Sequence, residues 1–81
     1  MLSCSEYDHI EIVCMHQYPI KLTMKAGGVI EGKALDTGYN DQRQECIKVD
    51  TGSAEEMVVL AELASLAVCV DNPHFKQVSF T

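Results

Sequence analysis

The side chains in this sequence that could do chemistry are mainly four cysteines and three histidines. Cys14 and His16 are the nearest cysteine–histidine pair, and Cys4 and His9 lie on the same segment. Zinc sites usually use closely spaced ligands such as Cys-x-x-Cys, and the sequence has no such spacing. We therefore expect no metal site and no cofactor. We expect reduced thiols rather than disulfides, because the N-terminus does not read as a secretory signal.

Nucleophilic catalysis would need a cysteine or serine next to a base. Cys14, His16 and Asp8 are the best candidates, but side chains two residues apart on a helix do not face each other. The sequence has neither a Gly-x-Ser-x-Gly elbow nor a glycine-rich phosphate loop. The acidic pair Glu55-Glu56 is expected on the solvated surface. We therefore predict no catalytic residues and a protein that is not an enzyme.

Residues 5–17 are predicted to form the helix that positions these groups. Ser5 is a suitable N-cap, and Asp8 three residues later can complete a capping box. Apolar side chains recur at helical spacing and predict a single buried stripe, made of Tyr7, Ile10, Val13 and Cys14.

From Tyr18 onward the pattern changes to the alternation of β-strands. Five or six short strands are predicted from about residue 19 to 80: a first strand from residue 19, then 29–36, 45–51, two strands around 57–60 and 66–70, and 76–80. A single 3₁₀-like turn is predicted at 61–63, a polar loop at 37–43 and a turn at 71–74. In the 45–51 strand, Ile47 and Val49 are expected on one face, with Cys46, Lys48 and Asp50 on the other.

These elements predict the fold class. The 81 residues are expected to form one domain, 1–81, that is mostly β, with an N-terminal α-helix and a small antiparallel barrel. A barrel is favoured over a two-sheet sandwich because closing a sheet removes its edges with the fewest residues. No apolar run approaches the roughly 18 residues needed to span a bilayer.

The charge distribution points to a docking surface. The chain has 12 acidic and 6 basic residues, a net charge of −6, and its first basic residue is Lys21. Asp8 and Glu11 share a helix face next to Tyr7, with Glu6 in the first turn. These groups fit a basic partner, although acids at the start of a helix are also favoured by its dipole. Nonspecific binding to nucleic acid or to an anionic membrane is not expected.

The sequence resembles the Rho-binding antiterminator family, small bacterial inhibitors of the termination factor Rho. The resemblance lies in Glu6-Tyr7-Asp8-x-Ile10-Glu11-x-x-Cys14 followed by Ile20-x-Leu22, and continues through Lys33-Ala34-x-Asp36, Leu63-x-Ser65-Leu66 and the turn with His74. It covers residues 4–80. Two departures are His9, where asparagine is more usual, and Asn40-Asp41 in the loop, where a basic pair can occur.

The resemblance implies an Sm-like β-barrel that binds the RNA-capturing N-terminal domain of Rho in the cytoplasm and blocks RNA binding. A site for single-stranded RNA is basic and aromatic, so an acidic protein can occupy it. Carried over by matching positions, the partner-binding residues are Glu6, Tyr7, Asp8 and Glu11. Asn40 and Asp41 are added from their place in the loop alone. The alternative is an Sm-like RNA-binding module. It would need a basic or aromatic groove, whereas the six cations here are scattered.

Overall fold

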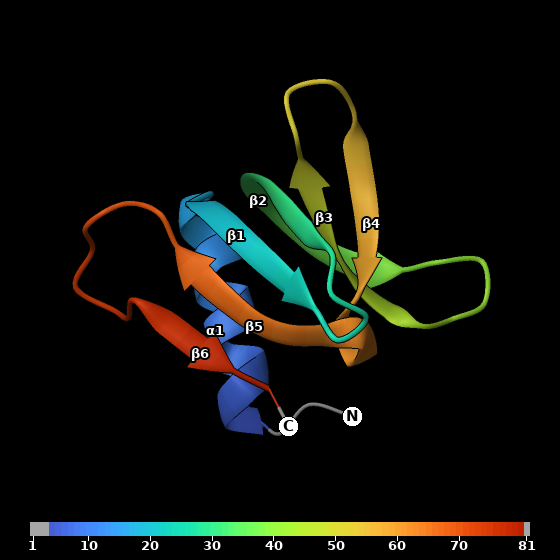
Figure 1. The fold of residues 1–81 in the computed structure, drawn as a ribbon, viewed down its shortest axis with the longest axis horizontal. Coiled ribbons are helices and arrows are strands. Elements are labelled where there is room, and N and C mark those ends of the chain that lie inside the picture. The colour runs from blue at the N-terminus through green and yellow to red at the C-terminus, as the bar shows by residue number, and fades with distance from the viewer. Residues whose placement is uncertain (1–3, 81) are drawn as a thin grey trace.

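A computed structural model of the chain describes residues 4–80 and shows one helix followed by six strands (Figure 1). The elements are α1 (Cys4–His16), β1 (Pro19–Met24), β2 (Val29–Tyr39), β3 (Glu45–Asp50), β4 (Glu55–Val59), the 3₁₀ helix η1 (Leu60–Glu62), β5 (Leu63–Val68) and β6 (Gln77–Ser79). The predicted class, mostly β with antiparallel strands and an N-terminal helix, is confirmed. Residues 1–3, at the N-terminus that does not read as a secretory signal, lie outside the described residues.

Helix α1 buries the predicted apolar stripe. Ile10 and Val13 are fully buried, and Tyr7 and Cys14 pack beside them against the core. The predicted N-cap was wrong by position: α1 already includes Cys4, so Ser5 lies inside the first turn. Within residues 4–80 no helix has the length and apolar character needed to cross a membrane.

The C-terminal end of α1 turns the chain sharply into the first strand. Gln17 takes a left-handed conformation with φ 51°. The Tyr18 N–H donates to the Val13 carbonyl at 3.0 Å, and the Gln17 N–H donates to the Cys14 carbonyl at 3.2 Å. These two bonds form a Schellman motif, which satisfies carbonyls that would otherwise lack partners. The helix can therefore fold back on the sheet after only two connecting residues.

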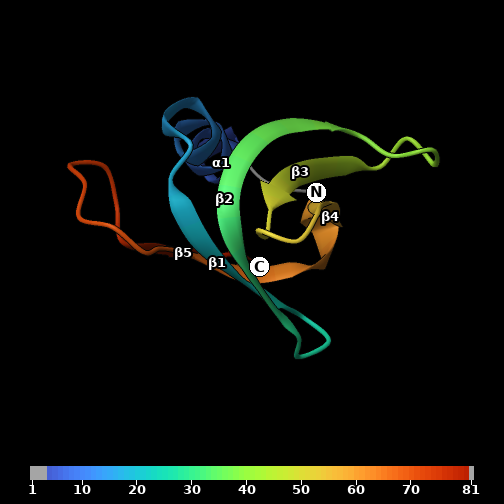
Figure 2. The same ribbon diagram turned by 90° about the horizontal axis from the view of Figure 1, so that it is seen from above.

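All six strands belong to one antiparallel sheet in the order β4-β3-β2-β1-β5-β6. The sheet curves strongly, and β2 follows a wide arc around the core (Figure 2). Among the described residues no ladder joins β4 to β5 or β6, so β4 and β6 remain edges. Closure into a barrel by strand pairing is therefore not confirmed.

The bend of β2 depends on a close backbone approach at Gly32. A Cβ atom there would lie 2.4 Å from the Asp50 carbonyl oxygen and 2.6 Å from a Val49 methyl carbon. The β2–β3 register also shifts between Ala34 and Asp36. Gly32 thus lets the two strands cross closely where the sheet bends.

Strand β2 is longer than predicted. It continues through Tyr39, so residues 37–39 are strand rather than loop, paired with residues 45–47 of β3. In β3, Ile47 and Val49 are buried as expected, and Cys46 is fully buried as well, although it alternates with Ile47 along the strand. Cys46 pairs with Val59 of the neighbouring strand β4, and its thiol donates to the Gln44 carbonyl at 3.3 Å.

The predicted break between two apolar runs is confirmed by η1. It joins β4 to β5 and is tied to the β1–β2 turn, where the Lys25 N–H donates to the Glu62 carbonyl at 2.9 Å. Strand β5 begins at Leu63, three residues earlier than expected.

The turn before β6 is organised by Asn72. Its side-chain oxygen accepts from the N–H groups of His74 and Phe75, and its amide nitrogen donates to the carbonyls of Val70 and Phe75. The predicted turn at 71–74 is therefore confirmed.

Candidate functional site

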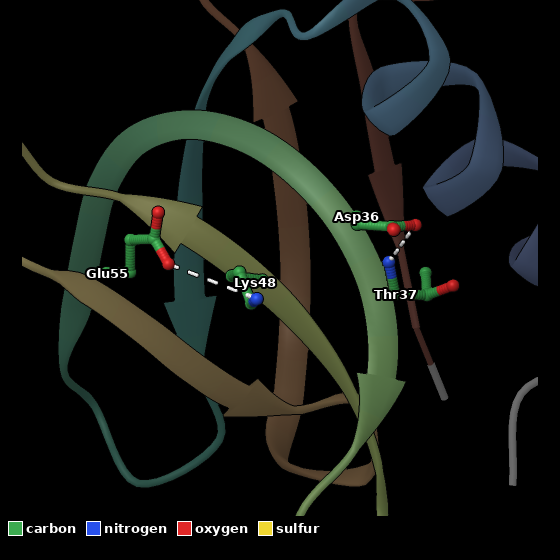
Figure 3. Close-up of polar contacts among 4 residues, drawn as sticks. All are labelled: Asp36, Thr37, Lys48 and Glu55. Carbon is green, nitrogen blue, oxygen red and sulfur yellow. Dashed lines mark hydrogen bonds and ion pairs between the residues drawn. The ribbon is translucent and has the colours of Figure 1, made fainter.

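The acidic residues Asp8 and Glu11 lie on the exposed side of α1. Within residues 4–80 the ion pair formed joins Lys48 of β3 to Glu55 of β4, with the two charged atoms 3.9 Å apart (Figure 3). No lysine or arginine of the described range therefore pairs with Asp8 or Glu11. Their charges are available to a partner.

Glu6 and Tyr7 in the first turns of α1 are partly buried. Tyr7 packs against the hydrophobic core, so one part of its side chain is fixed while the rest remains accessible beside Asp8. A half-anchored aromatic ring loses little side-chain entropy when a partner covers it. Tyr7 is therefore well placed to contribute contact area next to the carboxylates.

The structure adds a residue to the predicted group, Asp36 of β2. Strand β2 packs against α1, and a depression of about 350 Å³ lies between them, lined in part by Glu11, Cys14 and Asp36. The Asp36 side chain accepts a hydrogen bond from the Thr37 N–H at 2.8 Å (Figure 3). We call Asp8, Glu11 and Asp36 the acidic surface. Only the packing of α1 on β2 joins Asp36 to the helix, and no local sequence pattern signals it.

The carboxylates next to this depression affect Cys14. Burial first, and then the negative charges of Asp36 and Glu11, together raise the pKa of the Cys14 thiol from 9.0 to about 11. The side chain is therefore a neutral thiol at physiological pH. A neutral, half-buried thiol is a poor nucleophile, which agrees with a packing role for this residue.

We expect Cys14 to be alkylated by iodoacetamide much more slowly than the exposed Cys4 and Cys69. Mass spectrometry of peptides after timed labelling at mildly alkaline pH measures the alkylation rate of each cysteine. Alkylation of Cys14 as fast as of Cys69 would contradict the slow reaction expected of a buried, neutral thiol.

The raised pKa also makes the stability of the fold depend on pH. Because the pKa of Cys14 is higher in the folded than in the unfolded chain, its contribution to stability is complete below pH 9.0 and is lost as the pH rises towards about 11.

Asn40 and Asp41 lie at the β2–β3 hairpin. The Asn40 side-chain oxygen accepts from the N–H groups of Gln42 and Gln44, both at 2.9 Å, and its amide nitrogen donates to the Gln44 side chain at 2.9 Å. Asn40 thus uses its polar atoms to hold the hairpin, whereas Asp41 is exposed. The hairpin projects away from α1 in both views (Figures 1 and 2). The structure therefore does not bring these two residues to the acidic surface.

The histidines pack against aromatic rings rather than around a common point. His16 stacks on Tyr18 and on His74, with ring centroids 5.1 and 4.9 Å apart, and His9 meets the edge of Phe75 at 4.5 Å. In the described part of the chain no group of three or more histidine, cysteine or acidic residues is arranged to hold a metal ion. These rings connect α1 to the turn before β6.

Comparison with known proteins identifies the relatives of this chain. Residues 1–80 match the family described as Modulator of Rho-dependent transcription termination (ROF). A solved structure described as YaeO bound to magnesium, from Vibrio cholerae O395, is similar with a TM-score of 0.90 and 39% sequence identity, covering 93% of this chain and 97% of that chain. No curated protein sequence matches.

The family description names a regulatory role in transcription termination rather than a catalysed reaction, and it implies Rho as the partner. Magnesium belongs to the description of the Vibrio structure.

Proposed function

We propose that this chain, which belongs to the ROF family of modulators of Rho-dependent transcription termination, inhibits termination by binding the N-terminal, RNA-capturing domain of Rho. The observation that carries the proposal is the acidic surface of α1 and β2, with carboxylates of Asp8 and Glu11 that pair with no lysine or arginine of residues 4–80. A surface that holds single-stranded RNA combines cationic and aromatic side chains. Carboxylates can take the place of the phosphates there.

The mechanism is competitive exclusion. The net charge of −6 attracts the chain towards a basic groove and speeds the encounter. Asp8 and Glu11 then contact cations of Rho, while Glu6 and Tyr7 add contacts from the first turns of the same helix. RNA cannot enter a groove that this helix covers, and Rho that has not captured RNA cannot terminate transcription.

The hairpin residues Asn40 and Asp41 remain weaker candidates for contacts with Rho. They lie away from α1, so they would have to reach a different part of the Rho hexamer (Figure 2). We expect no direct binding of RNA by this chain, because its six cations are outnumbered by 12 acidic residues. The proposed action takes place in the cytoplasm and needs no cofactor and no catalysis.

Binding to Rho is expected to weaken steeply as the salt concentration rises. Contacts between carboxylates and cations are screened, with a Debye length of about 10 Å at 0.1 M ionic strength. Isothermal titration of Rho with this chain over a series of potassium chloride concentrations measures the effect. A dissociation constant that does not change between low and moderate ionic strength would contradict the electrostatic mechanism, although not binding itself.

The functional test is transcription in vitro on a template with a Rho-dependent terminator. Adding this chain together with Rho should increase read-through in proportion to its concentration, and a second template with a Rho-independent terminator should show no change. Unaltered termination at a several-fold excess of the chain over Rho would overturn the proposal.

A further inference from the structure

We propose a second docking site at the open edge of β4, which takes an extended peptide segment with lysine or arginine alternating with apolar residues. Strand β4 is the last strand on its side of the sheet and pairs only with β3 among the described strands (Figure 1). The outer side of such a strand presents backbone N–H and C=O groups that another strand can use. The opposite edge, β6, has only three residues against five in β4.

A hollow of about 310 Å³ lies beside this edge, between β4 and the β1–β2 hairpin. Its apolar lining includes Met24 and Ile30 from β1 and β2, and Met57 and Val59 from β4. Met24, Ile30 and Val59 are partly buried, so each keeps some accessible apolar surface, whereas the Met57 side chain lies over β3, where its terminal carbon would be 3.7 Å from a Cβ at Gly38. Apolar side chains that stay accessible beside an unpaired edge favour an added strand with apolar groups of its own.

The charges around the hollow determine which sign of charge a partner segment must have. Glu56 and Glu62 line it, both are exposed, and its lining contains no lysine, arginine or histidine. A segment with cations at its polar positions would meet these carboxylates while its apolar side chains fill the hollow.

A second copy of this chain fits the edge poorly. Each copy has a net charge of −6, and β4 contains Glu55 and Glu56 but no lysine or arginine, so two copies repel each other as their β4 edges approach. The same repulsion protects the exposed edge from self-association, a common device of natural sheets. The observations therefore favour a basic segment of another protein.

This site is separate from the acidic surface. Helix α1 and strand β4 lie on different sides of the molecule in both views (Figures 1 and 2). The acidic surface is formed by α1 and β2, whereas the β4 hollow is formed by β4, η1 and the β1–β2 hairpin. The two sites can be tested independently with different variants.

The test uses the full chain labelled with ¹⁵N and a capped synthetic peptide of alternating lysine and valine, followed by amide chemical shifts. We expect saturable shifts concentrated in β4 and the β1–β2 hairpin. The variant Glu56→Lys/Glu62→Lys should weaken binding by at least about tenfold. The matched variant Asp8→Lys/Glu11→Lys, with the same change in net charge on α1, should bind the peptide nearly as well as the native chain.

Two further peptides separate strand addition from simple charge attraction. A peptide with every second amide N-methylated keeps its charges but cannot donate backbone hydrogen bonds to the edge of β4. We expect it to bind at least about tenfold more weakly. A glutamate–valine peptide should not bind. The proposal is overturned by no saturable shift, by shifts centred on α1, by equal binding of the methylated peptide, or by self-association of the chain through β4.

Discussion

The double variant Asp8→Lys/Glu11→Lys is expected to lose Rho binding by about a thousandfold while keeping its fold. In the proposed complex each new lysine faces cations of Rho, and close like-charge contacts across an interface cost several kcal/mol in total, on the order of a thousandfold in affinity. RNA should then bind Rho as if the chain were absent. No other substitution on the surface is expected to change function as much.

The fold should tolerate this change, because Asp8 and Glu11 are exposed on α1 and lie off the buried stripe of Ile10 and Val13. Exposed substitutions usually change stability by less than about 0.5 kcal/mol. Removing an acid from the first part of the helix adds a cost of about 1 kcal/mol at most. Circular dichroism and thermal melting of the variant verify that it is folded.

The matched control is Glu45→Lys/Glu55→Lys, which has the same change in net charge on exposed residues of β3 and β4. It breaks the Lys48–Glu55 pair, but both side chains of that pair are well exposed, and such a pair contributes at most about 1 kcal/mol. The control should retain most of its affinity for Rho. Equal losses in the two variants would show that net charge, rather than the surface of α1, determines binding.

The variant Gly32→Ala is expected to destabilise the fold by about 2–3 kcal/mol, as overpacking of a tight site does. The new Cβ would lie 2.4 Å from the Asp50 oxygen and 2.9 Å from its carbonyl carbon, and both atoms are backbone. The clash can be relieved only by moving β2 away from β3, which weakens their ladder at the pair Lys33–Asp50. For a chain of this size the melting temperature should fall by roughly 10–20 °C.

Gly28→Ala is the matched control for the loss of a glycine. Its added Cβ would meet only a Met24 side-chain carbon at 3.8 Å, an ordinary contact, and Gly28 does not have a positive φ. The melting temperature of Gly28→Ala should therefore stay close to that of the native chain, whereas that of Gly32→Ala falls. Similar melting temperatures for both would contradict the proposed close approach of β2 and β3.

The sequence predicts the helices and strands of this fold well where the apolar residues follow a single helical or strand spacing. The stripe from Tyr7 to Cys14 and the alternation from Ile20 to Met24 each have one buried side, so their type and orientation follow from local pattern. Residues 37–39 follow no such pattern. They extend β2 because they pair with β3 and because Asn40 closes the hairpin, and both contacts depend on the folded chain.

The candidate site is predictable only in part for the same reason. The exposed position of Asp8 and Glu11 follows from helical spacing, as expected. Asp36 joins them through the packing of α1 on β2, and the use of Asn40 within its own hairpin follows from the position of Gln44. Contacts between segments distant in the sequence leave no periodic signal, so they require the structure.

The most direct test of the central claim is displacement of a fluorescent single-stranded RNA from Rho by this chain, measured by anisotropy at several RNA concentrations. Competition for one surface predicts complete displacement, with a midpoint that rises linearly with the RNA concentration. A midpoint independent of RNA concentration, or an RNA that stays bound while the chain also binds Rho, would contradict the claim that the acidic surface occupies the RNA-capturing site.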